Sequence, residues 1–193
     1  MSFTEQKFTI PSLKGISAKT IEEHLKLYAG YVKHANLIRD ELSKKDGGEY
    51  ARAEMMRRFG FEYNGMRNHE VYFASLEGGS TALTAGGPLQ RAIEKNFGGL
   101  DAWLAGFKTL ALTRGIGWAM LYYDRKDGRL LNAWVDEQHL GQLQDCALIL
   151  GLDMWEHSFV ADYQPSGKKQ YIEDFFASLN WSAVEKNFSE AAR

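Results

Sequence analysis

The chain has a single cysteine, Cys146, among its 193 residues, which excludes an internal disulfide bond. It also has no run of about 18 apolar residues and no charged segment leading into an apolar stretch at its start. Neither a membrane-spanning helix nor a secretory leader is therefore indicated. Together these absences predict a protein of a reducing, cytoplasmic setting that engages no membrane.

A block of charge of one sign is missing as well, because 23 basic and 25 acidic residues are interspersed and leave a net charge of −2. We therefore expect no nucleic-acid-binding surface, and an anionic ligand would have to be attracted by a local group of cations. No internal repeat or low-complexity segment occurs. With 45% hydrophobic residues, the chain can bury a core as one compact domain or as two small domains that share an interface.

Two long helices are predicted for the first part of the chain. Apolar side chains recur at helical spacing over residues 17–42, with Ser17 as the N-cap, and a second helical pattern covers residues 50–76. The turn signal at residues 44–48 joins them into a hairpin. We expect the second helix to be interrupted where a glycine follows a phenylalanine or an asparagine, at residues 59–60 and 64–65.

The second part of the chain has a different pattern. A glycine-rich hinge at residues 78–88 precedes two helical patterns, three aliphatic and aromatic runs typical of strands, and two more helical patterns. The expected helices are residues 89–97, 100–113, 170–179 and 182–188, and the expected strands are 116–123, 130–135 and 148–152. The first two strands should form a hairpin around residues 124–128. We predict an α+β protein with an N-terminal helical hairpin domain, residues 1–84, and a C-terminal α/β domain, residues 85–193.

Histidine is scarce: the chain has five, and three of them lie with Asp153 in contexts that suit a metal site. One comes from each predicted long helix, and one from the stretch 151–159, which also carries the aspartate. Three imidazoles and a carboxylate suit iron, manganese or zinc better than calcium or magnesium. The residues alone leave a second interpretation open, in which these are buried histidines satisfied by hydrogen bonds within an ordinary core.

Several blocks of the sequence, in order, resemble the iron/manganese superoxide dismutase family. The most specific is Asp-Met-Trp-Glu-His at residues 153–157, followed by Asp162-Tyr163 and by residues 171–181. The other blocks are residues 16–24 with Tyr31-Val32, Asn68-His69, residues 115–118, and Gln138. The resemblance covers nearly the whole chain. It implies an N-terminal helical hairpin and a C-terminal domain with a three-stranded antiparallel sheet, with the metal between them.

The resemblance implies an enzyme that converts superoxide to oxygen and hydrogen peroxide at one manganese or iron ion per subunit. A solvent molecule completes the metal's ligands, and the implied protein ligands are His24, His69, Asp153 and His157. Trp118 and Trp155 would form an apolar wall beside the metal. In this family the acid before the last histidine reaches the same histidine of a partner, so Glu156 implies a homodimer, or a tetramer, joined through this region.

Two further residues are implied to act on the chemistry. Tyr31 would gate the substrate channel, and Gln138 would hydrogen-bond the metal's solvent ligand and thereby tune the metal's potential. His139 competes for the second role, because some members use histidine there. Manganese-type members combine a glycine at the position of Gly65 with a glutamine at that of Gln138, and Gly151 is also manganese-like. We expect manganese, with iron or either metal as the alternative.

The first helix departs from the family pattern. The family separates its ligand histidine from its tyrosine by about eight positions, whereas His24 and Tyr31 are seven apart. Seven residues return to within about 20° of the starting direction, while eight leave about 80°, so the longer spacing needs an inserted residue such as a π-bulge. We expect a helix without this bulge that keeps both side chains inward. The alternative alignment puts Glu23 in the place of His24.

The positions of the family's interface relay, a histidine and a tyrosine, also differ. They are occupied by Leu27 or Tyr28 and by Val160, so proton supply would rely more on water, with His34 as a possible substitute. Lys168 is the cation expected to steer superoxide. A non-catalytic metal-binding member would need a missing ligand, and a zinc hydrolase finds no support in the surrounding blocks. A di-iron bundle would need glutamates three residues before its histidines, which none of the five has.

Overall fold

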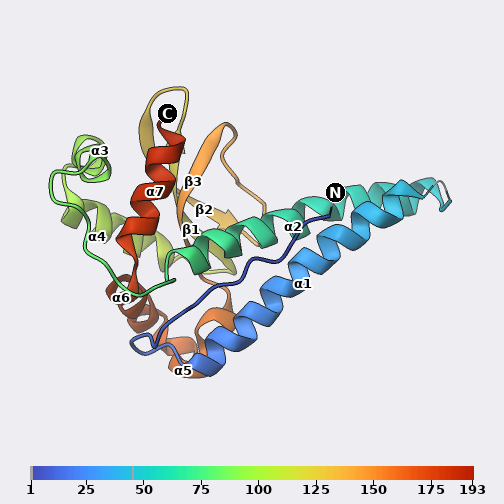
Figure 1. The fold of residues 1–193 in the computed structure, drawn as a ribbon, viewed down its shortest axis with the longest axis horizontal. Helices are drawn as coiled ribbons and strands as arrows, with labels where there is room; N and C mark the ends of the chain where they lie inside the picture. Colours follow the sequence, from blue (N-terminus) through green and yellow to red (C-terminus); the bar gives the residue numbers. More distant parts are fainter. Residues whose placement is uncertain (1, 45) are drawn as a thin grey trace.

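Two long antiparallel helices form an arm that projects from the rest of the molecule (Figure 1). The computed structural model describes residues 2–44 and 46–193. Helix α1 spans Ala18–Ser43 and helix α2 spans Glu49–Ala74, which confirms the predicted hairpin. Ser17 is the N-cap, because its side chain accepts a hydrogen bond from the Thr20 N–H. Lys45, in the middle of the predicted turn, lies outside the described residues.

The predicted interruptions of the second helix are wrong. Helix α2 continues through residues 59–60 and 64–65 without a break. A glycine in a helix interior costs about 1 kcal/mol relative to alanine. Helix α2 packs against α1 along its length and against the third strand, and this tertiary contact outweighs the local preference of Gly60 and Gly65.

The C-terminal part contains the predicted helices and strands, with bounds that differ from the expected ones by at most three residues, and one short helix, α5, that was not predicted. The helices are α3 (Pro88–Phe97), α4 (Leu100–Ala111), the short α5 (Val160–Tyr163), α6 (Lys168–Ser178) and α7 (Trp181–Ala191). The strands are β1 (Gly117–Asp124), β2 (Arg129–Asp136) and β3 (Cys146–Asp153). Placing a domain boundary between residues 84 and 85 stays a prediction.

The three strands form one antiparallel sheet in the order β2-β1-β3, which confirms the fold class. The β1–β2 hairpin closes at Asp124, whose Oδ1 accepts hydrogen bonds from the N–H groups of Lys126 and Asp127, and Gly128 takes the left-handed conformation (φ 64°). The central strand β1 is almost wholly buried, which means that both of its faces are covered. This explains why its residues are apolar in a continuous run and do not alternate with polar ones.

The register of the sheet determines where the end of β3 lies. Trp118, near the start of β1, pairs with Asp153 at the end of β3 and with Val135 of β2. Helix α2 packs on β3, and α1 contacts the turn that follows it. Polar residues at the end of β3 are therefore brought against the inner faces of both long helices. Among the described residues, no helix is both long enough and apolar enough to cross a membrane.

Candidate metal centre

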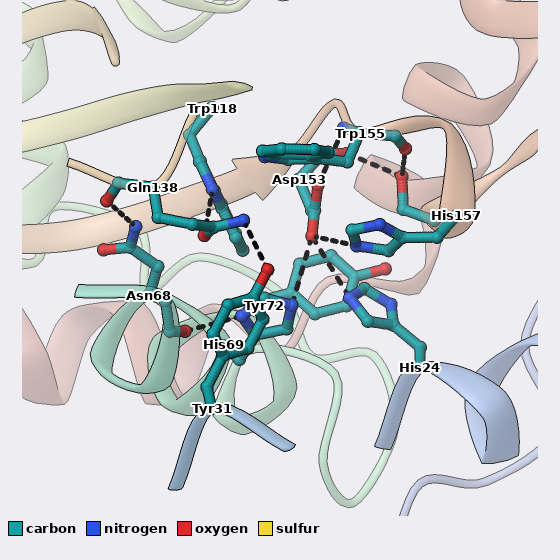
Figure 2. Close-up of polar contacts among 12 residues, drawn as sticks. His24, Tyr31, Asn68, His69, Tyr72, Trp118, Gln138, Asp153, Trp155 and His157 are labelled. Atoms are coloured by element: carbon teal, nitrogen blue, oxygen red, sulfur yellow. Dashed lines mark hydrogen bonds and ion pairs between the residues drawn. The ribbon is translucent and has the colours of Figure 1, made fainter. Parts of the chain in front are cut away.

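Four side chains with metal-binding atoms converge where the helical hairpin meets the end of the sheet (Figure 2). Asp153 Oδ2 lies 3.1 Å from His24 Nε2 on α1, 3.5 Å from His69 Nε2 on α2, and 3.2 Å from His157 Nε2 in the turn after β3. One donor atom from each residue lies within 4.8 Å of the other three. The structure thus brings together the four residues that the family resemblance implies as ligands.

The surroundings of these donors favour neutral imidazoles at His24 and His69 and an ionised carboxylate at Asp153. The side chains of His24, His69 and Asp153 are fully buried, and that of His157 is 28% exposed. Burial lowers the pKa of His24 and lowers the pKa of His69 to about 3. Burial alone would raise the pKa of Asp153, but the interactions with His157 and His24 outweigh it and hold this pKa below its ordinary value. These protonation states are the ones that bind a transition metal.

One buried nitrogen is unexplained without a cation. The Nδ1–H of His69 donates to the Gly65 carbonyl oxygen at 2.6 Å, so its Nε2 carries the lone pair. This Nε2 is buried and has no hydrogen-bond partner among the residues that the structure describes. It faces the carboxylate Oδ2 of Asp153 at 3.5 Å, and two electron-rich atoms at that distance repel each other. A metal ion between them would satisfy both, so the residues fit the manganese or iron that the family implies.

The backbone at Asp153 is held firmly. Its carbonyl oxygen accepts a hydrogen bond from the Tyr171 hydroxyl at 3.0 Å. The Ser158 hydroxyl lies 3.0 Å from the same oxygen and 2.6 Å from the Trp155 carbonyl oxygen, and its single proton serves one of these two acceptors at a time. Since Tyr171 donates to a carbonyl, it can only accept from the Tyr72 hydroxyl, which lies 3.2 Å away. The Asp153 Oδ1 accepts from the Trp155 backbone N–H at 2.8 Å. These bonds leave Oδ2 directed at the three imidazoles.

Helix α1 reaches this geometry without a bulge. It is α-helical throughout Ala18–Ser43, and both His24 and Tyr31 are buried, so seven positions of an ordinary helix suffice to place them on one inner face. Glu23 faces solvent instead, and its carboxylate pairs with Lys26 at 2.9 Å. The geometry therefore favours His24 over Glu23 as the donor from this helix.

Gln138 lies buried between Trp118 and Tyr31 (Figure 2). Trp118 Nε1–H can only donate, so the Gln138 Oε1 at 3.0 Å is its acceptor, and the Gln138 Nε2 then donates to the Tyr31 hydroxyl oxygen at 3.0 Å. The Tyr31 hydroxyl keeps its own proton, because burial, followed by the charge of Asp153, raises its pKa. His139 instead packs edge-on against Phe61 at 5.7 Å.

Two tryptophans and two glycines shape the space around the donors. The ring of Trp118 meets that of His69 edge-on at 5.1 Å, and the ring of Trp155 stacks on His157 at 5.8 Å. A Cβ at Gly65 would lie 2.6 Å from the Tyr31 ring, so only glycine fits there while Tyr31 stays in place. A Cβ at Gly151 would make an ordinary 3.5 Å contact with Trp118.

A cavity of about 500 Å³ leads to Tyr31 and His157 from the surface. It is lined by residues of α1, by α2 and by Trp155, and it includes two cations that the sequence analysis missed, Lys26 and Arg58. Arg58 Nε bonds Glu62 at 2.8 Å. The sequence spacing could have identified Arg58. Positions 58, 62, 65 and 69 recur every three or four residues, so Arg58 shares one face of α2 with Gly65 and His69.

The remaining expected residues lie at the edge of this region or away from it. Exposed His34 lines the cavity beside Tyr31. Glu156 is exposed in the turn after β3. Lys168 does not line the cavity, since its Nζ donates to the Thr113 carbonyl at 2.8 Å and lies over the Trp134 ring. The expectation that Lys168 steers ligand at the entrance is therefore not supported, whereas Arg58 is a cation that does line the cavity.

The chain is similar to known proteins over most of its length. The family model described as "Iron/manganese superoxide dismutases, C-terminal domain" matches residues 85–187. A superoxide dismutase (Fe) of Cupriavidus metallidurans is 36% identical over 188 residues, which is 94% of this chain and 92% of the relative. A superoxide dismutase (Mn/Fe) of Aeropyrum pernix is 32% identical, covering 87% of this chain and 80% of the relative.

A superoxide dismutase (Mn) of Mycolicibacterium smegmatis is also 32% identical, covering 87% of this chain and 82% of the relative. The metals in these names differ while the identities are similar, so the similarity does not select one metal. The match over nearly the full length agrees with the fold and with the cluster of three histidines and an aspartate, and on these grounds the chain belongs to the iron/manganese superoxide dismutase family.

Proposed function

We propose that the chain converts superoxide to oxygen and hydrogen peroxide at one manganese ion per subunit, held by His24, His69, Asp153 and His157. The observation that carries this proposal is the buried convergence of four donor atoms within 4.8 Å of one another, with His69 Nε2 unpaired among them. A redox-active manganese or iron supplies the electron acceptor for one superoxide and the electron donor for the next, which zinc cannot do.

The protein's own residues would position the small anion and exclude water. Trp118 and Trp155 pack against His69 and His157 and limit solvent on that side. Tyr31 receives its hydrogen bond from Gln138, which leaves the hydroxyl proton free for another acceptor. We propose that Gln138 and Tyr31 act together as hydrogen-bond donors beside the metal site. Tyr31 lines the entrance cavity, so its hydroxyl would be the first of the two to meet the substrate.

Manganese is proposed over iron on the pairing of Gly65 with Gln138. The glutamine amide that would approach the centre comes from the loop after β2, and the helix position four residues before His69 has no room for a side chain. Gly151 supports the same choice less strongly, because an alanine would fit there. The alternatives are an iron-dependent enzyme and one that works with either metal.

The metal proposal predicts a difference between two preparations of the same protein. Metal-free protein loaded with manganese should dismutate superoxide rapidly, and the same protein loaded with iron should be much slower. The measurement is the dismutation rate per bound ion, with metal content determined on each preparation. Equal rates would contradict the preference for manganese but would still support dismutase activity. Inactivity of both stoichiometrically loaded forms would contradict the proposed function.

The entrance cavity predicts that Arg58→Glu lowers kcat/KM several-fold at low ionic strength. The change places two acids, at positions 58 and 62, beside the path of an anion and reverses local steering. Arg57→Glu is the matched control, because Arg57 is a neighbouring exposed arginine on α2 that does not line the cavity. The defect of Arg58→Glu should shrink as salt rises. Equal effects of both variants would assign the loss to overall charge.

We also propose a cytoplasmic homodimer, or a tetramer, joined through the region of Glu156. This residue is exposed directly before His157 in a turn at the surface, and His157 itself is part-exposed, so a second copy could contact both. Sedimentation of the metal-loaded protein would measure the assembly, and a monomer at micromolar concentration would contradict the proposal.

A further inference from the structure

The loop between β2 and β3 holds Gln138 by its main chain as well as by its side chain. The loop closes through two backbone bonds, Asp136 N–H to Leu140 O at 2.9 Å and Leu140 N–H to Asp136 O at 3.1 Å. The Gln138 carbonyl oxygen accepts from Asn68 Nδ2 at 2.9 Å and makes a longer contact of 3.4 Å with Gln142 Nε2. The Asn68 contact can be followed in Figure 2.

The direction of each hydrogen bond in this group is determined. A carbonyl oxygen can only accept, so Asn68 must turn its NH₂ toward Gln138 and its Oδ1 away. That Oδ1 accepts from Gln142 Nε2 at 3.2 Å, which turns the Gln142 Oε1 toward the Tyr122 hydroxyl that donates to it. Burial raises the pKa of Tyr122, so this hydroxyl remains a donor. Gln142 therefore stabilises the Asn68 orientation that the Gln138 carbonyl requires, by supplying the donor to the Asn68 Oδ1.

Gln142 lies on a different side of the loop from the entrance to Tyr31. It lines a second cavity of about 400 Å³, together with Asn68, Tyr122 and Glu70. This cavity and the entrance cavity have no lining residue in common. A change at Gln142 can alter the position of Gln138 while leaving the path to Tyr31 unchanged.

We propose that Gln142 is a positioning residue for the reaction: through Asn68 it fixes the peptide of Gln138, and thereby the distance between the Gln138 amide, Tyr31 and the metal site. The inference rests on the proposed function. Without the Gln142 amide, the Asn68 Oδ1 loses its donor and the Gln138 carbonyl loses its second, longer contact. The Gln138 peptide is then held by Asn68 alone, and the Gln138 side chain is held less firmly at its distance of 3.0 Å to Tyr31.

The test is Gln142→Met in the metal-loaded protein, with Gln144→Met as the matched control. Methionine keeps the length of the side chain and removes its donor and acceptor, and Gln144 is an exposed glutamine of the same loop. We expect Gln142→Met to lower kcat roughly tenfold, with KM unchanged because the entrance is intact, and to shift the midpoint potential of the bound metal. Gln144→Met should change none of these.

A second readout separates this inference from the proposed function. In the metal-free full-length chain, the side-chain amide resonances of Gln138 should move or broaden in Gln142→Met and stay in place in Gln144→Met. This readout decides the positioning role even if wild-type protein proves inactive with both metals. Unchanged Gln138 resonances, or wild-type kcat and potential in Gln142→Met, would overturn the proposal.

If Gln142→Met does not fold, Tyr122→Phe tests the same chain from its far end. Removing the hydroxyl frees the Gln142 amide to rotate, so the shifts in kcat, potential and Gln138 resonances should have the same direction and a smaller size. Wild-type values of all three in Tyr122→Phe would then contradict the proposal.

Discussion

The variant His24→Ala is expected to lose its bound metal and to fall more than about 100-fold in dismutase activity, whereas Glu23→Ala should retain both. Replacing residues that merely orient metal ligands typically costs 10–100-fold in metal affinity or activity, so removing a ligand should cost more. His24 Nε2 lies 3.1 Å from Asp153 Oδ2 inside the cluster, while the adjacent Glu23 side chain is 62% exposed and pairs with Lys26.

The measurement is metal content per chain after dialysis against a chelator, followed by the dismutation rate of the same samples. Glu23→Ala is a strict control, because it lies one residue away on the same helix and tests the alternative alignment directly. Thermal unfolding of both metal-free variants would show that each has folded. Full occupancy and activity in His24→Ala, with loss of both in Glu23→Ala, would reverse the assignment of the ligand on α1.

Sequence periodicity was sufficient to locate α1 and to predict which of its side chains point inward. His24 and Tyr31 are seven positions apart, so an undistorted helix must place both on nearly the same face, and the structure has such a helix. The converging histidines could be predicted only from the family motif, because nothing in their spacing relates α1 and α2 to the end of β3. That relation depends on the strand register and on the packing of α2 against β3.

Local sequence patterns gave wrong or missing predictions where tertiary contacts outweighed local preferences or where no motif existed. Gly60 and Gly65 suggested breaks in α2, but packing on both sides keeps the helix continuous. Lys168 had the expected spacing from Tyr171, yet spacing along α6 does not reveal that its amine is bound to the Thr113 carbonyl. Gln142 belongs to no block of the family resemblance, and its proposed role depends on a hydrogen bond to Asn68, 74 residues earlier in the chain.

The second large effect is expected for Gly65→Ala. Gly65 is one of the two residues on which the proposed preference for manganese rests. A Cβ there would lie 2.6 Å from the Tyr31 ring, a distance at which something must move, and the rigid ring is the nearest group. Displacing Tyr31 breaks its 3.0 Å bond with Gln138. We expect kcat to fall at least ~10-fold, since small misplacements of a positioned group carry costs of up to ~100-fold.

Gly60→Ala supplies the matched control on the same helix. Its new Cβ would make only an ordinary 3.6 Å contact with His139, and alanine favours the helix by about 1 kcal/mol. Overpacking at Gly65 costs typically ~1–3 kcal/mol, so Gly65→Ala should be the less stable variant by roughly this amount in denaturant unfolding of the metal-loaded proteins. If both alanines stabilise the protein equally and leave kcat unchanged, Tyr31 can yield without cost. In that case the glycine at position 65 would no longer support the proposal that this site prefers manganese, which rests on the pairing of Gly65 with Gln138.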